Sequence, residues 1–479
     1  MVENYRKTMS EDLKDNIRVR FDQLAKKRGK WLQRNRYYYE DQRKYFRFLI
    51  PERCSVLELG CGTGDLLAAL KPRRGLGIDL SHGMVSQARE SFPELDFRVG
   101  DIECLENIQE SFDFIILSDV IGLLLDVEET LNGLHKFCKT ETRIVISYYN
   151  FLWEPMLKLG ERLGLKMPQK HQNWLSTADI SNLLYLADFQ VVKQEFRLLI
   201  PKRLPIVSSF LNRYLAPLPG FRKLCLSCYI VARSLKRAQK GDCSTSIVIP
   251  CLNEKGNVEA AVKRLSRFGG HQEIIFVDGH STDGTQEEIK RVIAANPDKD
   301  IKLFVQDGHG KGDAVRKGFR EAKGEILMIL DADLTVPPED LAKFYSVLVG
   351  GKGEFINGCR LVYPMENQAM RLLNLFANKF FGLTFSWLLN QRIKDTLCGT
   401  KVLLREDYER IAANRGYFGE FDPFGDFDLI FGAAKMNLKI VEVPIRYRER
   451  SYGNTNIRRF RHGWLLLKMT AFAFKKLKV

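Results

Sequence analysis

The chain has 479 residues, more than one hydrophobic core usually serves, so two or three domains are expected. An apolar share of 45% and a mean hydropathy of -0.21 exclude a largely disordered chain. The net charge of +15 favours polyanionic partners, which include nucleic acid, an anionic membrane face and phosphorylated small molecules.

The N-terminus and the cysteines indicate a cytoplasmic setting. The opening stretch, MVENYRKTMSEDLKDNIRVRF, is charged throughout, and we expect no signal peptide there. The ten cysteines are scattered, mostly in apolar segments, which is typical of reduced thiols. The CxxC from Cys225 to Cys228 has no second pair to complete a zinc site, so we interpret it as part of a helix face.

A glycine-rich turn between two predicted strands is the first functional motif. Residues 55–70, SVLELGCGTGDLLAAL, predict a buried strand, a tight turn and a helix, and the strand that follows ends in Asp79. Gly60, Gly62 and Gly64 carry no Cβ, so the backbone can approach a ligand closely where the helix presents free N–H groups. Asp79 is placed to accept hydrogen bonds from ribose hydroxyls.

These motifs make residues 35–150 resemble the class I S-adenosylmethionine-dependent methyltransferases. The stretches that carry the resemblance are ELGCGTG, GIDLSHGMVSQARE, VGDIECL and FDFIILSDVIGLLLDV. The resemblance implies a Rossmann-like domain that binds S-adenosylmethionine. In it, Glu58 and the glycine loop hold the methionine moiety, and Asp79 holds the ribose.

The same resemblance implies the remaining cofactor contacts. Asp101 and Ile102 would contact the adenine, Asp119 would face the methyl-transfer site, and Tyr38 and Tyr39 would close over the cofactor. The histidine that many of these enzymes carry after the fourth strand is missing from DVIGLLLDV, so a hydroxyl acceptor that needs a base is less favoured. The methyl acceptor stays open, as does a domain that binds the cofactor without catalysing transfer.

A polar, basic stretch divides the chain. Residues 233–246, RSLKRAQKGDCSTS, are short of large apolar side chains, and an alternation of strands and helices begins again after them. We therefore predict one domain at 1–236, a linker at 237–245 and a second domain at 246–479.

The second domain repeats the pattern of strands that end in acids. The stretches from 245 and from 273 each predict an apolar strand followed by a helix, which favours a second parallel sheet. The charged residues after the successive strands are Glu254, Asp278, Asp283, Asp307, Lys311, Asp331 and Asp333. Ligands of such sheets bind at the carboxyl ends of the strands.

Asp331 and Asp333 end the apolar run LMILDADL with one residue between them. Two carboxylates with this spacing can share a divalent cation such as Mg²⁺, which prefers oxygen ligands, whereas a buried pair without a cation would be costly. The alternative is a solvated turn that caps the helix after it.

The second domain resembles the inverting family 2 glycosyltransferases of the GT-A fold, and among them the polyprenyl-phosphate sugar transferases similar to dolichyl-phosphate mannose and glucose synthases. The motifs, spread over residues 245–450, are IVIPCLNE, FVDGHSTDGT, GHGKGDAVRKG, LDADL, INGCRL, DTLCGTKVL and FDLIFGAAK. The resemblance implies a UDP- or GDP-linked sugar donor. The residues assigned to the donor are Pro250, Glu254, Asp278, Asp283, Lys311 and Asp331.

Within that set, Pro250 and Glu254 would frame the nucleobase and ribose, and Asp278 would bond the base. Asp333, with Asp331, would hold Mg²⁺ or Mn²⁺ on the diphosphate, where the cation neutralises charge that builds on the leaving phosphate.

The sugar acceptor stays open between a polyprenyl phosphate and a glycan or small-molecule hydroxyl. A lipid phosphate is already anionic and needs no strong base, so arginines would position it. The candidates are Arg360, Arg446, Arg448, Arg450, Arg458 and Arg459, unless the basic run from 446 is only a solvated face. A hydroxyl acceptor needs a base, for which the candidates are Asp395, Asp426 and Asp428.

Two apolar segments near the C-terminal end, 372–389 and 463–479, predict amphipathic helices with basic margins. Neither offers the roughly 20 uncharged residues of a membrane span. Helices of this kind suit an anionic membrane interface, although core or lid helices are the alternative. We expect a cytoplasmic protein attached peripherally to the membrane face.

The leading hypothesis is a bifunctional enzyme, with methyl and sugar transfer in one glycoconjugate pathway. A glycosyltransferase that acts on a hydroxyl, with a methyltransferase that modifies the same product, is the second. A basic nucleic-acid-binding protein is the third, but no specific nucleic acid is expected, because no recognition motif accompanies the charge.

Overall fold

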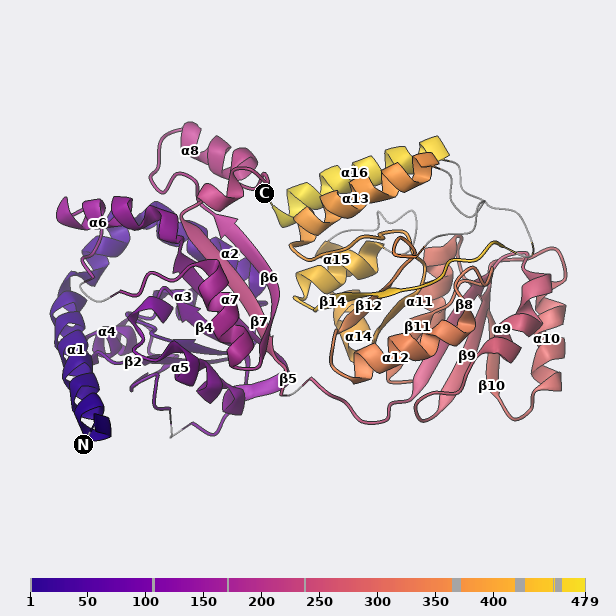
Figure 1. Cartoon of the computed structure of the whole chain (residues 1–479), viewed down its shortest axis with the longest axis horizontal. Coiled ribbons are helices and arrows are strands. Elements are labelled where there is room, and N and C mark those ends of the chain that lie inside the picture. Colours follow the sequence, from indigo (N-terminus) through magenta and orange to yellow (C-terminus); the bar gives the residue numbers. More distant parts are fainter. Residues whose placement is uncertain are drawn as a thin grey trace. The chain divides into compact units, whose positions relative to one another are not determined.

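The computed structural model describes residues 2–105, 108–169, 172–236, 238–363, 372–417, 427–450, 452 and 459–478. The chain divides into two compact units, Met1–Arg237 and Ala238–Val479 (Figure 1). In the described residues each unit is built on a mixed sheet of seven strands with helices packed against it. The predicted fold class, two doubly wound α/β domains in succession, is confirmed.

The sheet of unit 1 has the strand order β3-β2-β1-β4-β5-β7-β6. Its strands are β1 (Ser55–Leu59), β2 (Arg74–Asp79), β3 (Asp96–Val99), β4 (Phe112–Ser118), β5 (Cys138–Tyr149), β6 (Phe189–Arg197) and β7 (Ser227–Ser234). The first five run parallel, and β7 lies antiparallel between β5 and β6. Every residue of β1 is buried, as expected for a parallel strand covered on both faces.

The helices of unit 1 cover both faces of this sheet. They are α1 (Val2–Arg34), α2 (Arg36–Leu49), α3 (Asp65–Ala69), α4 (His82–Ser91), α5 (Val127–Gly133), α6 (Glu154–Arg162), α7 (Thr177–Leu186) and α8 (Val207–Phe210). Short turns of helix are η1 (Ile121–Leu123), η2 (Leu134–Phe137), η3 (Phe151–Trp153), η4 (Leu211–Leu215) and η5 (Arg222–Leu224). One core contains Leu57 and Ile115, and the core on the opposite face contains Val56 and Ile116.

The sheet of unit 2 has the order β10-β9-β8-β11-β13-β12-β14. Its strands are β8 (Thr245–Cys251), β9 (Gln272–Asp278), β10 (Asp300–Val305), β11 (Ile326–Ile329), β12 (Phe355–Cys359), β13 (Lys401–Leu404) and β14 (Ile440–Pro444). The first four are parallel, and β13 runs antiparallel between β11 and β12. The carboxyl ends of β8, β9 and β11 therefore meet at one edge of the sheet.

The helices of unit 2 are α9 (Val258–Arg264), α10 (Thr285–Ala295), α11 (Lys311–Glu321), α12 (Leu341–Val349), α13 (Leu372–Leu389), α14 (Arg405–Ala413), α15 (Phe427–Lys435) and α16 (Arg459–Leu477). Short turns are η6 (Lys255–Asn257), η7 (Pro338–Asp340) and η8 (Arg415–Tyr417). Two buried clusters cover the two faces of the sheet, one around Val248 and Leu327 and one around Ile247 and Met328.

The two predicted amphipathic helices are present as α13 and α16, which lie side by side along unit 2 (Figure 1). The rings of Trp387 and Phe474 are 5.6 Å apart between centroids, and Phe385 and Leu466 belong to the core. On the other face Leu383 is 75% exposed. Both helices thus have one face in the core and one face outside. In the described part of the chain, no helix combines the length and the apolar content needed to cross a membrane.

The interpretation of the CxxC as a helix face is wrong. Cys225 follows the short turn η5, and Cys228 lies in β7, where it is buried. Every residue of β7 is buried because the strand lies between two others. A continuous apolar run of this kind has no period that separates a strand from a helix.

Candidate functional site

The glycine loop after β1 forms the floor of the first site. Gly60, Gly62 and Gly64 all have positive φ angles, of 74°, 52° and 78°. A Cβ at Gly60 would lie 2.6 Å from Val120 Cγ2, so this glycine is needed for packing, whereas a Cβ at Gly62 would meet no atom within 4 Å. The Gly62 N–H donates to Asp79 Oδ2 at 2.8 Å, which fixes the loop against the end of β2. The loop is therefore rigid where it packs and open at Gly62.

Two buried carboxyl groups flank this loop. Asp79 Oδ1 also accepts the Ser81 N–H at 2.9 Å, and burial raises the pKa of Asp79. Glu58 is 2% exposed, and burial raises its pKa well above the ordinary value of 4.5. Among the described residues, Glu58 Oε2 is buried and has no hydrogen-bond partner. Such an orphaned oxygen is costly unless a ligand satisfies it.

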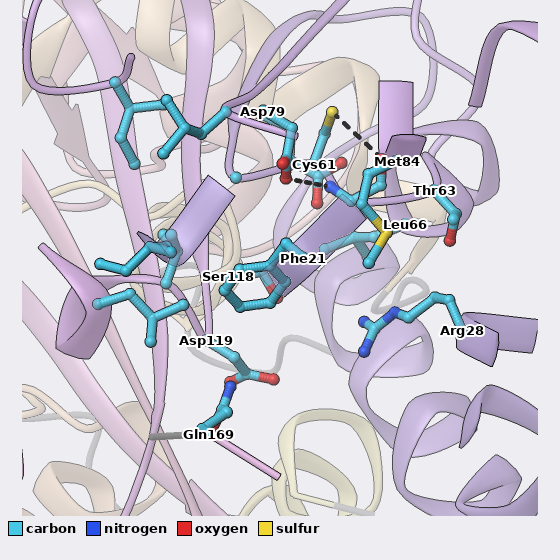
Figure 2. A pocket seen from close by; sticks show the side chains of 18 of the residues that line it. Phe21, Arg28, Cys61, Thr63, Leu66, Asp79, Met84, Ser118, Asp119 and Gln169 are labelled. Carbon is cyan, nitrogen blue, oxygen red and sulfur yellow. Dashed lines mark hydrogen bonds between the residues drawn. The ribbon is translucent and has the colours of Figure 1, made fainter. Parts of the chain in front are cut away.

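Glu58, Gly62 and Asp79 line a cavity of about 180 Å³. Figure 2 shows Phe21 between Asp79 and Asp119, with Arg28 across the cavity from the strand ends. The predicted residues Tyr39, Asp101, Ile102 and Asp119 belong to the same lining. Tyr38 lies behind it. The structure thus brings the residues of the glycine motif and the later strand ends into one cavity.

One wall of the cavity is α1, which sequence reasoning missed. Lys14, Phe21 and Arg28 of this helix all line the cavity. Lys14 Nζ pairs with Asp101 Oδ2 at 2.6 Å and with Glu103 Oε2 at 2.5 Å. These residues are seven apart, a spacing that keeps them on one face of a helix. That spacing could have indicated that this face of the helix lines a site. Two of the three side chains are charged, however, so the face shows no hydrophobic periodicity.

Asp119, after β4, is held by a network of donors. Its carboxylate accepts from Tyr38 Oη at 2.7 Å, Gln42 Nε2 at 2.9 Å and Ser147 Oγ at 3.1 Å. Burial raises the pKa of Asp119, and these three hydrogen bonds oppose the rise. Asp119 also has a φ of 55°, which is uncommon for a residue other than glycine. The contact of Tyr38 with the cavity is therefore indirect, through Asp119.

The second site lies at the carboxyl ends of β8, β9 and β11 in unit 2. Asp278, the last residue of β9, is fully buried, and its Oδ2 accepts the Gln286 amide at 2.7 Å and the Ser281 N–H at 3.1 Å. Its other oxygen, Oδ1, is buried without a hydrogen-bond partner in the described residues. Pro250 lies near the end of β8, beside Val277 of β9. Asp278 thus offers one unused acceptor at this edge of the sheet.

Asp331 follows β11 and is paired with Lys311 at the start of α11. The distance from Lys311 Nζ to Asp331 Oδ1 is 2.7 Å. Burial alone would raise the pKa of Asp331, but Lys311, together with Lys401 and Arg360, holds the pKa below its ordinary value. The backbone of Gly399 packs so closely on this pair that any side chain there would collide with Asp331 and Lys311.

Asp333 is paired with Arg450, which follows β14. Arg450 Nη2 lies 2.9 Å from Asp333 Oδ2 and 3.4 Å from Glu254 Oε1, so one guanidinium joins the ends of two strands. The other oxygen of Asp333 accepts the Thr335 hydroxyl at 2.8 Å. Within the described residues, no group of three or more His, Cys, Asp or Glu side chains could hold a metal ion.

Arg360 and Asp395 form a buried ion pair beside this edge. The two bonds join Nε to Oδ2 at 2.7 Å and Nη2 to Oδ1 at 2.8 Å. Asp395 is fully buried, and although burial opposes it, Arg360 holds the pKa of Asp395 below its ordinary value. Asp428 pairs instead with Arg415 at 3.2 Å and lines a separate small cavity that contains none of the strand-end acids.

Most of the remaining predicted residues are the arginines that follow β14 in the sequence. Arg446 and Arg448 are exposed, and the Arg448 N–H donates to the Thr335 carbonyl at 2.9 Å. Arg458 and Asp426 lie outside the described residues, and so does the side chain of Arg459. Asp283 accepts the Thr285 N–H at 3.0 Å at the start of α10. Arg446 and Arg448 thus follow the same segment that brings Arg450 to Asp333.

Comparisons with known proteins match each unit to a family. Residues 6–194 match the family model of a methyltransferase domain, and residues 246–412 match that of glycosyl transferase family 2. The chain is 28% identical over 222 residues to the glycosyltransferase AglJ of Haloferax volcanii. It is 29% identical over 220 residues to a dolichol-phosphate mannosyltransferase of Pyrococcus furiosus.

These relatives are matched over part of their length. The two alignments cover 46% and 44% of this chain, and 68% and 59% of the relatives' own lengths. Among solved structures, a Haloferax volcanii methyltransferase in complex with a methyltransferase activator is 21% identical, with a TM-score of 0.36, over 45% of this chain and 97% of its own. On the family matches, the chain contains a methyltransferase domain followed by a domain of glycosyl transferase family 2.

Proposed function

We propose that the protein is a bifunctional enzyme of one glycoconjugate pathway. Unit 2 transfers a sugar, with inversion, from a UDP- or GDP-linked donor to a polyprenyl phosphate. Unit 1 transfers a methyl group from S-adenosylmethionine. The names of the Pyrococcus relative and of an undecaprenyl-phosphate sugar transferase from Aeromonas, 31% identical over 110 residues, support the polyprenyl acceptor.

The unused oxygen of Asp278 is the observation that carries the donor site. A nucleobase N–H that donated to Oδ1 would satisfy the orphaned acceptor at the end of β9. Lys311 and Arg450 lie at the same strand ends, where their charges would neutralise a diphosphate. The base and the diphosphate would then take the positions that parallel sheets usually offer to ligands.

The donor set at Asp331 and Asp333 fits a divalent cation only together with the diphosphate. Mg²⁺ is usually held by one or two carboxylates and by substrate phosphates, so two aspartates are sufficient. When bound, the cation would neutralise charge on the leaving phosphate. Arg450 would have to leave Asp333 for the carboxylate to bind the cation. The guanidinium of Arg450 could then pair with the diphosphate, which is also an anion.

The ion pair of Arg360 and Asp395 favours a phosphate acceptor over a hydroxyl. Both oxygens of Asp395 are engaged by Arg360, and its pKa is lowered, so it is a poor base. Arg360 is instead held rigidly and can orient an anionic acceptor, which attacks without losing a proton.

In unit 1, Glu58 Oε2 carries the proposal for the cofactor. The methionine end of S-adenosylmethionine bears an ammonium group, which can donate to this buried acceptor. Asp79 would accept from the ribose, and Arg28 offers a cation for the methionine carboxylate. The sulfonium supplies the activated methyl group, so the protein's task is alignment and exclusion of water.

We infer a cytoplasmic enzyme that works at the membrane face. The exposed sides of α13 and α16 carry Leu383 and Trp464, with Lys379 and Lys468 beside them. Apolar and basic side chains on one helix face suit an anionic interface.

The test is transfer of radiolabel from a panel of nucleotide sugars to polyprenyl phosphate with Mg²⁺ present. Label in the organic phase that disappears in Asp333→Asn, but not in the matched variant Asp298→Asn of an exposed surface pair, supports the proposal. Label that enters only a soluble hydroxyl acceptor would replace the lipid phosphate with that acceptor. No transfer from any donor would contradict the glycosyltransferase activity.

A further inference from the structure

Between β6 and β7 of unit 1 the chain leaves the sheet and returns without adding a strand. This excursion, residues 198–226, contains α8 and the short turns η4 and η5. Its charged residues are all basic: Lys202, Arg203, Arg213, Arg222 and Lys223. A stretch of this length without one acid gives its surface a single sign of charge.

Large apolar side chains of the excursion face outwards. Ile206 is 86% exposed, Phe210 59%, and Leu204 and Val207 are 49% exposed. Ile206 also has a φ of 63°, a strained conformation for a β-branched residue. Soluble proteins rarely display contiguous apolar surface of this kind unless it binds something.

Helix α6 extends this surface. Met156, Leu159 and Leu163 are exposed at the spacing that places them on one helix face. Trp153, just before α6, donates from Nε1 to the Leu224 carbonyl of the excursion at 2.8 Å. Figure 1 shows α6 and α8 standing out from the same side of unit 1. We call the exposed apolar residues of 151–165 and 204–224, with their basic neighbours, the docking surface.

The docking surface rests on the residues behind the cavity. Asn212 of the excursion donates to Tyr37 Oη at 3.1 Å, and Leu198 packs with Tyr38 and Tyr149. Tyr38 in turn donates to Asp119 at the cavity wall. Contacts through Tyr37 and Tyr38 therefore connect the excursion with the side of the cavity where Asp119 lies.

We propose that the docking surface seats unit 1 on an anionic lipid bilayer, so that the methyltransferase takes an acceptor borne by the membrane. The charge favours lipid, because the charged residues of the excursion are all basic, and the two acids of α6, Glu154 and Glu161, are each paired with a lysine. Apolar side chains beside basic ones match an interface of acyl chains and anionic headgroups. Only the identity of the acceptor rests on the proposed function. Attachment of the surface itself requires neither a sugar donor nor S-adenosylmethionine.

The experiment measures co-sedimentation of the full chain with two kinds of phosphatidylcholine vesicle. One kind contains no phosphatidylglycerol, and the other contains about 30% of this anionic lipid. The double variant Ile206→Ser, Phe210→Ser should lose about 10-fold in partitioning to anionic vesicles. Arg203→Glu with Lys223→Glu should remove the preference for anionic over neutral vesicles. The matched control replaces two exposed apolar residues of α7, Tyr185→Ser with Leu186→Ser, and should bind like the unaltered chain.

Membrane attachment through unit 2 is distinguished from attachment through unit 1 by the double variant Leu383→Ser, Trp464→Ser. This variant is measured alone and in combination with the unit 1 variants. Vesicle binding that survives Ile206→Ser, Phe210→Ser unchanged, with S-adenosylmethionine binding intact as the check on folding, overturns the proposal. Self-association that is lost in this variant, without vesicle binding in the unaltered chain, also overturns it and makes the surface an interface between copies. Either result leaves sugar transfer by unit 2 untouched.

Discussion

The acids that line the cavity of unit 1 and the two paired acids Asp331 and Asp395 of unit 2 are prepared for ligands in opposite ways. In unit 1, burial raises the pKa values of Glu58, Asp79 and Asp119, and Glu58 keeps an oxygen without a hydrogen-bond partner in the described residues. In unit 2, Asp331 and Asp395 are each paired with a cation that lowers the pKa. The first arrangement suits a cationic ligand that supplies the missing charge, and the second suits an anionic ligand that exchanges for a carboxylate. The way in which the acids of each site are neutralised in the free protein therefore corresponds to the charge of the ligand expected there.

For the paired acids of unit 2, the largest effect is expected from removal of the Asp395 charge. Asp395→Asn leaves Arg360 buried without its counter-ion, which should lower the free energy of unfolding by about 3 to 5 kcal/mol. Urea unfolding, with hydrogen exchange at β12 and β13, measures the loss. Asp298→Asn, in an exposed pair, should change stability by less than about 1 kcal/mol. An unaltered unfolding midpoint in Asp395→Asn would show that the pair is not a stabilising feature.

The two sites should also fail independently. Asp333→Asn should lower sugar transfer by about 100- to 1,000-fold and leave binding of S-adenosylmethionine unchanged. Asp79→Ala should weaken that binding by about 10- to 100-fold, since charged hydrogen bonds contribute about 1.5 to 3 kcal/mol each, and should leave sugar transfer intact. Sugar transfer and binding of S-adenosylmethionine are both measured on each variant. Loss of both in either one would mean misfolding or dependence between the units.

Cofactor affinity should depend on pH through Glu58. The folded protein without cofactor has a raised Glu58 pKa, so it holds this proton more tightly than the unfolded chain does. Its stabilising contribution is present at low pH and is lost as pH rises above the ordinary value of 4.5 towards the folded pKa. A bound ammonium favours the ionised form, so affinity should rise with pH by up to about 10-fold per unit below that pKa.

Glu58→Gln is the matching variant, because it keeps the shape and removes the titration. It should flatten the pH dependence of cofactor binding, lower the affinity and raise the stability of the free protein at neutral pH. Calorimetry in two buffers of different ionisation enthalpy detects the proton released on binding. A slope in Glu58→Gln equal to that of the unaltered chain would assign the titration to Asp79 or Asp119 instead.

The smallest effect is expected at Arg450, whose pair with Asp333 is partly exposed. Arg450→Ala should lower the Mg²⁺ concentration needed for half-maximal sugar transfer by up to about 5-fold, because an exposed pair contributes at most about 1 kcal/mol. The maximal rate should fall at the same time if the guanidinium passes to the diphosphate. Titration of activity with Mg²⁺ separates the two. A higher Mg²⁺ requirement would contradict competition between Arg450 and the cation.

The sequence predicts residues that belong to local motifs. Asp79 and Asp278 end apolar strands, and Asp331 and Asp333 come just after one. The sheet topology gathers such strand ends without further information. The fold class follows from the same alternation of strands and helices. The family resemblance of both halves likewise rests on short continuous motifs, and it is confirmed.

Partners that come from distant segments could not be predicted. Arg450 reaches Asp333 across more than a hundred residues, and Lys14 reaches Asp101 from a helix whose inner face is partly charged. Nothing local in the sequence distinguishes Arg450 from its exposed neighbours Arg446 and Arg448. Such pairs depend on where the chain crosses itself, and a pattern of apolar residues does not encode that crossing.

The place of β7 in the sheet bears on how unit 1 is made. β7 is the last strand of this unit to be synthesised, yet it lies between β5 and β6. Until residue 234 has left the ribosome, β5 and β6 lack the strand that pairs with both, and each presents an unpaired edge to the surroundings. A methyltransferase fragment that ended at residue 194, where the family match ends, would keep those edges exposed and should aggregate.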